Sequence, residues 1–107
     1  MREEINRIVK NLGISSELLG YNYICTAAEM ACFDEDIMKN MIDRLYPAIA
    51  MKYDKSPSSV ERAMRHAVMT AWDKGNRIIR DAFIKKPNNF HLIMYITDVV
   101  KKQQIPI

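Results

Sequence analysis

Apolar residues recur at helical spacing along nearly the whole of this chain. The clearest run lies within residues 57–75, PSSVERAMRHAVMTAWDKG. The residues between its apolar positions are mostly polar, so the run predicts an amphipathic helix with one buried face. The apolar side chains take the i, i+4, i+7, i+8 and i+11 positions of that face, and they are Val60, Met64, Ala67, Val68 and Ala71.

The same periodicity elsewhere predicts an all-α fold, a compact bundle of six to seven helices without a β-sheet. We expect one domain over residues 1–107, because a chain of this length can bury a helical core without disulfides or a metal. The last four residues, 104–107, are expected to fray. Caps and breakers place the helices at about 2–12, from Ser15 or Ser16 to 33, 34–45, 47–53, 58–74, 77–83 and 90–103.

The third of these segments is expected to form one regular helix. Asp34, Glu35 and Asp36 suit its N-cap and first turn, where the helix dipole favours acidic groups. They do not predict a metal site, because three consecutive residues on a helix point in different directions. The residues that this helix is expected to bury are Met38, Met41, Ile42 and Leu45.

Residues 46–74 have the layout of a helix-turn-helix. Pro47 stands in the first turn of a short helix, where its missing N–H costs nothing. A three-residue turn follows at Asp54–Ser56, and Ser56 with Pro57 supplies the N-cap and first position of the second helix, about 58–74. Asp54 stands where such turns often have glycine, and it tolerates the left-handed conformation better than most residues.

The exposed face of the second helix carries the candidate functional side chains. Arg62 and Arg65 leave the helix about 60° apart, so both can enter one DNA major groove and pair with guanine O6 and N7. Neither has an acidic residue four positions later, so we expect both to be free. The alternative is an ordinary amphipathic helix with a solvated basic face. A capping box from Ser58 to Glu61 is also possible and would engage Glu61 with the backbone.

The charge distribution favours DNA binding. The net charge is +3, but residues 1–51 carry 5 basic and 8 acidic side chains, whereas residues 52–86 carry 9 basic and 4 acidic ones. Positive charge therefore gathers on and just after the helix-turn-helix, where phosphates would be met. We expect phosphate contacts from Ser58, Lys52, Lys55, Lys85 and Lys86.

Other functional classes lack their characteristic patterns. Cys25 and Cys32 lie about 10 Å apart on one predicted helix, too far for a disulfide and without a nearby histidine, so we expect buried thiols. No phosphate loop or catalytic constellation occurs, and we expect no enzyme activity, metal or cofactor. No apolar stretch approaches eighteen residues and no signal-peptide layout opens the chain, which predicts a soluble cytoplasmic protein that does not enter a membrane.

Residues 46–76, YPAIAMKYDKSPSSVERAMRHAVMTAWDKGN, resemble the C-terminal effector domain of the stage 0 sporulation protein A family, response regulators that start sporulation. The string VERAMRHAV, followed by AW and KGN, is highly specific to that family. Upstream, LGI at 12–14 and LGYNY at 19–23 match its pattern. The resemblance extends from about Ile5 to Arg77 and fades afterwards.

This resemblance implies an all-α transcription regulator that binds TGTCGAA-like boxes in promoters and lies on the nucleoid when bound. It implies tandem copies on DNA and contact with an RNA polymerase sigma factor. At matching positions it assigns base reading to Glu61, Arg62 and Arg65 and places His66 near the phosphate backbone. The assignment agrees with chemistry, since arginine suits guanine and glutamate can accept from the N4 amino group of cytosine.

The chain departs from the family in three respects. These 107 residues contain no phosphoacceptor receiver domain, so we expect either an excised effector domain or a stand-alone relative. Leu19 replaces a residue that is often lysine. The segment after Phe83 is shorter and lacks the glycine-containing loop that helps to pair neighbouring copies, which weakens the inferences of dimerisation and sigma-factor contact. Two alternatives to specific DNA binding are a protein-interaction module that kept the fold and a nonspecific DNA-compacting protein. Retention of Arg62 and Arg65 argues against the protein-interaction module. The salt response of binding to matched and scrambled sites distinguishes a nonspecific DNA-compacting protein from a specific regulator.

Overall fold

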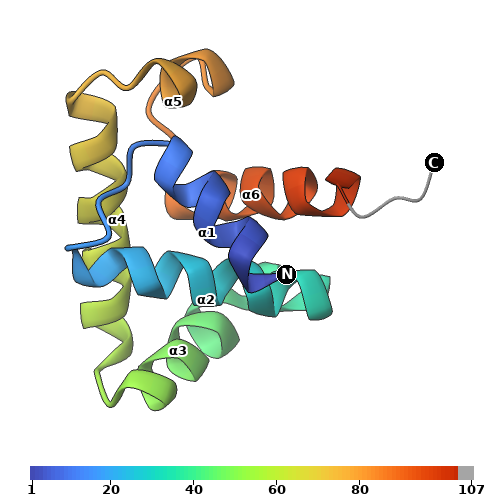
Figure 1. Cartoon of the computed structure of the whole chain (residues 1–107). Helices are drawn as coiled ribbons and strands as arrows, with labels where there is room; N and C mark the ends of the chain where they lie inside the picture. The colour runs from blue at the N-terminus through green and yellow to red at the C-terminus, as the bar shows by residue number, and fades with distance from the viewer. Residues whose placement is uncertain (104–107) are drawn as a thin grey trace.

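A computed structural model describes residues 1–103, which form α-helices and two short irregular helices without a strand. This confirms the predicted all-α bundle. The C-terminal four residues, where fraying was predicted, lie outside the described part. In chain order the elements are α1 (Arg2–Asn11), α2 (Leu19–Phe33), the 3₁₀-helix η1 (Glu35–Asn40), the π-helix η2 (Met41–Leu45), α3 (Tyr46–Tyr53), α4 (Pro57–Asp73), α5 (Arg77–Ala82) and α6 (Asn89–Gln103) (Figure 1).

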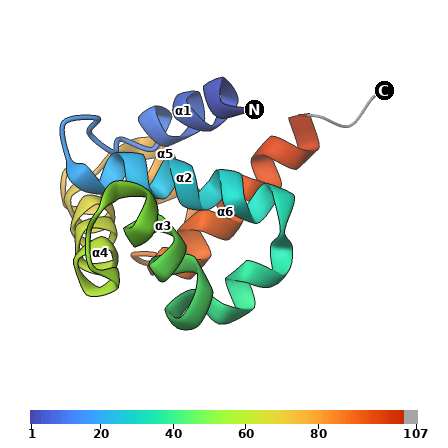
Figure 2. The ribbon, with the colours of Figure 1, turned by 90° about the horizontal axis from the view of Figure 1, so that it is seen from below.

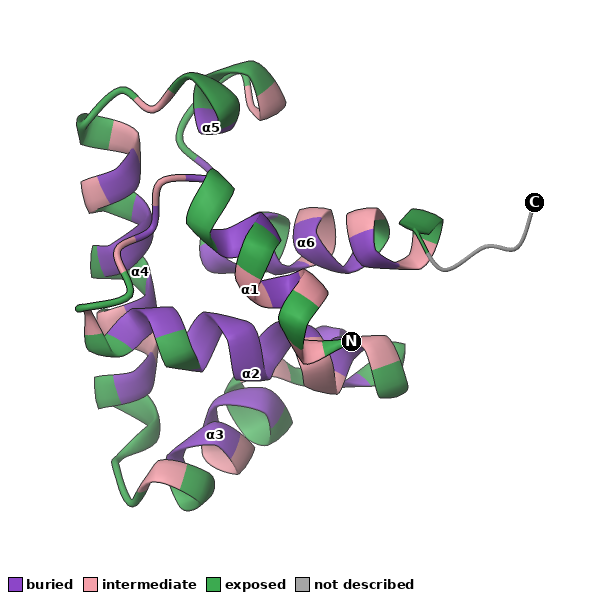
Figure 3. Cartoon of the chain, in the orientation of Figure 1, coloured by how far each residue is buried: buried purple, intermediate pink, exposed green. Residues whose placement is uncertain are grey.

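Helix α2 forms the centre of the bundle. It contacts α1, α3, α4 and α6, and Figure 2 shows it between α1 on one side and α3 on the other. Its middle is buried on all sides rather than on one stripe, as the colouring in Figure 3 makes clear. Small residues such as Ala27 and Ala28 make this possible, because they let neighbouring helices approach from several directions.

Helix α4 runs across the ends of α2 and α6 at one side of the molecule (Figure 1). Its inner face is the apolar stripe predicted from the sequence, and all five of the predicted residues are buried. Its outer face meets no other helix and is exposed in Figure 3. The fold therefore presents α4 as a ridge whose inner half belongs to the core.

Gly20 sets how closely α2 and α4 approach. A Cβ atom added to Gly20 would lie 2.2 Å from the backbone oxygen of Ala63 and 2.9 Å from the Cβ of Ala67. Only hydrogen fits between the two helices at this point. By helix propensity alone, a glycine at this position would only weaken the first turn of α2. The structure shows that it makes the contact on which the position of α4 depends.

The helix-turn-helix agrees closely with its sequence signals. Asp54 takes φ 56° and ψ 52°, and it is the one non-glycine residue with positive φ in the described chain. The Ser56 side chain accepts a hydrogen bond from the Ser59 N–H at 3.2 Å, and Pro57 is the first helical residue. Helices α3 and α4 pack directly against each other. The predicted turn, cap and proline positions are all confirmed.

The segment predicted as one regular helix over 34–45 is instead broken. Asp34 caps it as expected, accepting from the Asp36 N–H at 3.1 Å. Asn40, however, takes φ −133° and ψ 55°, which separates η1 from η2. This change of winding rotates Ile42 outward, and the residue is 80% exposed where burial was predicted. Met41 is only half-buried, whereas Met38 and Leu45 are buried as expected.

The predicted cap of α2 is wrong, and the predicted burial of both free thiols holds fully only for Cys25. Neither Ser15 nor Ser16 caps α2, which begins at Leu19 with no side-chain cap. The Ser15 hydroxyl instead accepts from the Glu17 N–H at 3.3 Å and closes a local turn. Cys25 is buried and Cys32 half-buried, both as free thiols, and burial raises the pKa of the Cys25 thiol to about 11.

None of the helices in residues 1–103 is long and apolar enough to cross a membrane.

Replacing Gly20 with alanine tests the close approach of α2 to α4. Alanine favours a helix over glycine by up to about 1 kcal/mol, but here its methyl group collides with the backbone of α4. We expect a net loss of about 1–3 kcal/mol in the free energy of unfolding, measured by chemical denaturation. Asn22→Ala, at an exposed position of α2, is the control. Unchanged or increased stability of the Gly20 variant would contradict this account of the packing.

Candidate nucleic-acid interface

The outer face of α4 carries most of the candidate residues. This face follows from the register that the buried stripe imposes, since side chains three and four positions apart share one side of a helix. Glu61 borders the face and is partly buried. The exposed residues of the face are Ser58, Ser59, Arg62, Arg65, His66 and Met69.

An open groove of about 580 Å³ runs along this face, and we call it the arginine groove. It brings together three of the predicted nucleic-acid contacts from α4 with one lysine from the segment between α5 and α6. Positive charge is thus concentrated on one concave surface, which is what an anionic backbone or base edge would require. Its lining residues are Ser59, Arg62, Ala63, Arg65, His66, Met69 and Lys86.

Lys86 reaches this groove because the chain on its C-terminal side is fixed. Pro87 is buried, and the Asn88 side chain accepts from the His91 N–H at 2.8 Å, which caps the start of α6. Asn89 is buried as well. Lys86 therefore stands one residue before an anchored segment, although the predicted helices left residues 84–89 as a connection between them.

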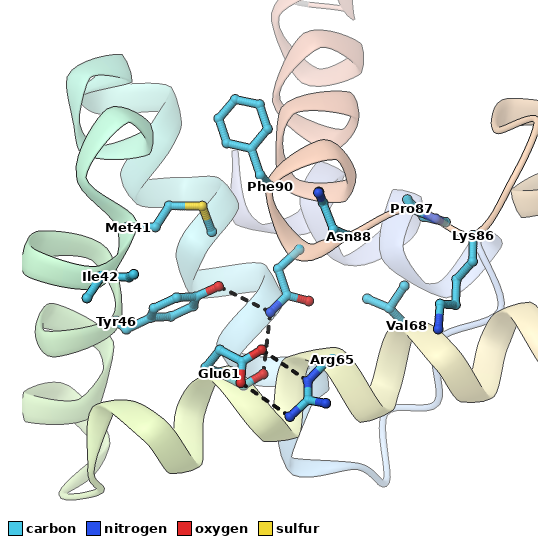
Figure 4. A pocket seen from close by; sticks show the side chains of 11 residues that line it. Met41, Ile42, Tyr46, Glu61, Arg65, Val68, Lys86, Pro87, Asn88 and Phe90 are labelled. Atoms are coloured by element: carbon cyan, nitrogen blue, oxygen red, sulfur yellow. Dashed lines mark hydrogen bonds and ion pairs between the residues drawn. The ribbon is translucent and has the colours of Figure 1, made fainter.

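Glu61 and Arg65 form an ion pair on the edge of the groove (Figure 4). The Arg65 Nε donates to Glu61 Oε2 at 3.1 Å, and Nη2 donates to Oε1 at 3.4 Å. The capping box considered for Ser58 and Glu61 is not formed, because Ser56 caps α4 and Glu61 is engaged with Arg65. The expectation that Arg65 is free is also wrong. Its acidic partner lies four positions before it rather than four positions after it.

Arg62 differs from Arg65 in this respect. Its side chain forms no ion pair or hydrogen bond within residues 1–103, and it is exposed. An exposed pair such as that of Glu61 and Arg65 contributes only about 0.3–0.5 kcal/mol to stability. Neither arginine therefore contributes much to the free energy of unfolding. They differ in orientation, because only the Arg65 side chain is held by an ion pair.

Asn89 ties α6 to both helices of the helix-turn-helix. Its amide Nδ2 donates to the Tyr46 hydroxyl at 3.2 Å and to the backbone oxygen of Glu61 at 3.4 Å. Burial raises the pKa of Tyr46, and the hydrogen bond from Asn89 partly opposes this. A buried polar side chain costs free energy unless its hydrogen bonds are made. Asn89 makes them only when α6 packs against α3 and α4 in this arrangement, so it favours this packing over others. The sequence did not reveal this bridge, because Asn89 lies two residues after Pro87 and before the predicted start of the last helix.

The remaining predicted phosphate contacts lie around the groove rather than in it. Lys52 in the last turn of α3, Lys55 in the turn and Ser58 at the start of α4 are exposed near one end. The Lys52 ammonium lies 5.8 Å from the centre of the Tyr53 ring. Lys85 is exposed beside Lys86 but does not line the groove. Only His66 and Lys86 of the predicted backbone contacts lie within it.

The far end of α4 is fixed by a different contact. Trp72 is half-buried against the core, and the Arg80 guanidinium lies 4.3 Å from the centre of its ring. Arg80 also donates to the Trp72 backbone oxygen at 2.7 Å. Arg80 is therefore engaged with the end of α4, which separates it from the basic residues that line the groove.

A second hollow, of about 500 Å³, adjoins the arginine groove, and we call it the apolar pocket. Figure 4 shows it between η2, α4 and the start of α6. It exists partly because Ile42 points outward, so the sequence could not reveal it. No cluster of three or more metal-binding side chains occurs in residues 1–103. The pocket is lined by Met41, Ile42, Tyr46, Glu61, Arg65, Val68, Lys86, Pro87, Asn88, Asn89 and Phe90.

Comparison with known families gives one match that covers most of the chain. A family model described as the C-terminal domain of sporulation initiation factor Spo0A matches residues 5–100. The match includes the whole helix-turn-helix and continues through α6 almost to its end. It therefore reaches further than Arg77, where the resemblance in sequence was expected to fade.

Removing the Tyr46 hydroxyl tests the role of Asn89. Tyr46→Phe leaves the ring in place but takes away one acceptor of the Asn89 amide, and we expect a loss of about 1 kcal/mol in unfolding free energy. Asn89→Ala should cost more, about 1–3 kcal/mol, because it leaves buried polar groups without a partner. Tyr95→Phe, which removes a hydroxyl without a hydrogen bond in the described chain, is the control. Equal effects at positions 46 and 95 in denaturation experiments would argue against the bridge.

Proposed function

The chain belongs to the family of Spo0A C-terminal domains, and from this we propose that it is a sequence-specific transcription regulator that reads DNA with α4. The family consists of DNA-binding effector domains of a sporulation regulator and is not a family of enzymes. The proposed target is a TGTCGAA-like box, with α4 lying in the major groove. The observation that carries the proposal is the arginine groove on the free face of the second helix of the helix-turn-helix.

The shape of the molecule supports this docking. The major groove is about 12 Å wide and admits one α-helix, and α4 stands at the side of the molecule with its outer face uncovered. Helix-turn-helix proteins contact base edges with the N-terminal part of the second helix. Arg62 and Arg65 lie in that part of α4, within three turns of its start.

The proposed base readers are Arg62, Arg65 and Glu61. The arginine forks suit guanines of the box, and the Glu61 carboxylate suits a cytosine amino group. His66, Ser58 and the lysines at 52, 55, 85 and 86 are proposed to contact phosphates, which position the helix without reading sequence. The concentration of positive charge in residues 52–86 supports this division, because the lysines flank the arginines rather than alternate with them.

The family resemblance also suggests tandem binding on DNA and contact with an RNA polymerase sigma factor, and we include both in the proposal. A second candidate function, a protein-interaction module that does not bind DNA specifically, is favoured by one observation. The apolar pocket exposes Ile42 at 80% and Phe90 at 39% of their surface, beside the groove. Such a surface suits a protein partner better than a phosphate backbone.

Alanine substitution of the arginines tests specific DNA reading. We expect Arg62→Ala and Arg65→Ala each to weaken binding to a TGTCGAA-containing duplex by about 1–3 kcal/mol, because each removes a bidentate base contact. Binding to a scrambled duplex should weaken much less. Lysine should restore only part of the loss, since it keeps the charge without the fork. Binding titrations at fixed salt measure both affinities.

The control for these variants is Arg77→Ala, at an exposed position outside the arginine groove. It removes the same charge but should change both duplexes alike. Equal losses on matched and scrambled duplexes for the α4 variants would show that the helix only grips phosphates. No loss on either, with the fold intact by circular dichroism, would favour the protein-interaction module.

The lysines should behave differently from the arginines. Alanine at Lys52, Lys55, Lys85 or Lys86 should weaken binding by similar factors on all sequences, because phosphates carry no sequence information. Each should also lower the slope of log affinity against log salt by about 0.9. A change in the preferred sequence on removing one of these lysines would reassign that residue to base reading.

A further inference from the structure

We propose that Glu61 is a positioning residue for Arg65, and that it makes the base pair opposite Arg65 the most strictly read position of the site. The inference rests on the proposed DNA-binding function and deepens it. It concerns how one arginine is oriented before DNA arrives. It changes the role of Glu61, because its carboxylate is engaged with Arg65. Glu61 then orients that arginine instead of reading a cytosine, the role that the family resemblance gives it.

The geometry of the pair leaves a specific part of Arg65 available. The Glu61 carboxylate engages the side edge of the guanidinium, through Nε at 3.1 Å and Nη2 at 3.4 Å. Arginine has five N–H donors in a rigid plane, so three remain, on Nη1 and the outer side of Nη2. Two of the three, one on Nη1 and one on Nη2, point in parallel from the end edge of the fork, and such a pair matches guanine O6 and N7.

Glu61 can act as a fixed support because its own position is determined. Its backbone oxygen accepts from the buried Asn89 amide at 3.4 Å. Met64, three residues further along the same helix, is fully buried and fixes α4 against the core. The Glu61 side chain is 35% exposed and that of Arg65 is 62% exposed, so the support is the more enclosed partner. The guanidinium therefore extends toward solvent from the more enclosed carboxylate, which belongs to a residue whose backbone is held by Asn89 (Figure 4).

Arg62 provides the internal comparison. It lines the same groove, but no acidic side chain engages it in the described chain. A free arginine must lose rotamer freedom when it binds a base, whereas an arginine held in place has already lost part of it. Arg65 is thus pre-organised and Arg62 is adaptable. A pre-organised fork tolerates a displaced or different base less well, which is the physical basis of stricter reading.

The test is a double-substitution cycle read out one base pair at a time. Wild type, Glu61→Ala, Glu61→Gln, Arg65→Ala and the Glu61→Ala/Arg65→Ala double variant are titrated with the matched duplex and with duplexes changed at single positions. Glu61→Ala should reduce discrimination at the same base pair as Arg65→Ala, by roughly 2- to 10-fold. The double variant should be no worse there than Arg65→Ala alone. Glu61→Gln, which keeps a hydrogen-bond acceptor, should lie between wild type and Glu61→Ala.

The matched control is Asp73→Ala. It removes one negative charge from the same helix at an exposed position outside the groove, so it raises overall affinity in a comparable way without altering Arg65. Because discrimination is a ratio of affinities, this general gain cancels. Thermal unfolding of each variant shows whether the fold is kept. A loss of stability alone would weaken binding to all duplexes alike, so it would not change the preference at a single base pair.

Three other results would overturn the inference. If Glu61→Ala alters preference at a different base pair and its effect adds to that of Arg65→Ala, Glu61 reads a base itself. If Glu61→Ala leaves every preference unchanged, the pair has no role in reading, although the proposed function stands as long as Arg65→Ala loses discrimination. If the wild-type chain does not distinguish matched from scrambled duplexes, both the inference and the proposed function fail.

Discussion

The position of α4 depends on one close backbone contact. At Gly20 the first turn of α2 approaches α4 so closely that the Ala63 carbonyl would collide with any side chain. Ala63 also lines the arginine groove together with Arg62 and Arg65, so the contact lies next to these candidate base readers. The depth at which α4 sits in the bundle, and hence how far its outer face projects, follows from the absence of one methyl group.

The second constraint comes from the other end of the chain. Asn89 links α6 to the Glu61 backbone and to Tyr46 of α3, so the two helices of the helix-turn-helix share a partner outside their own segment. The same stretch of chain places Lys86 in the arginine groove. Charge, orientation and packing at this face therefore depend in part on residues that are distant in sequence.

Local signals explain what could be predicted from the sequence. The turn at Asp54, the cap at Ser56 and the stripe of α4 depend on neighbouring residues, and all agree with the structure. The failures arise where distant packing decides. Asn40 breaks the segment before α3 although nothing nearby marks a break, and this turns Ile42 outward. Gly20 and Asn89 act through partners more than twenty residues away. The pairing of Arg65 was local but lay in the direction that was not considered.

The link between α6 and α4 has a consequence for how the proposed recognition surface can be moved between proteins. Residues 46–74 look like a portable unit, since they contain the turn, the cap and all three candidate base readers. Grafted onto another helical scaffold, they would keep Arg62 and the Glu61–Arg65 pair. They would lack the amide that holds the Glu61 backbone and the lysine that completes the groove. The smallest transplantable module is therefore discontinuous, a helix-turn-helix together with the start of a helix that follows it some fifteen residues later.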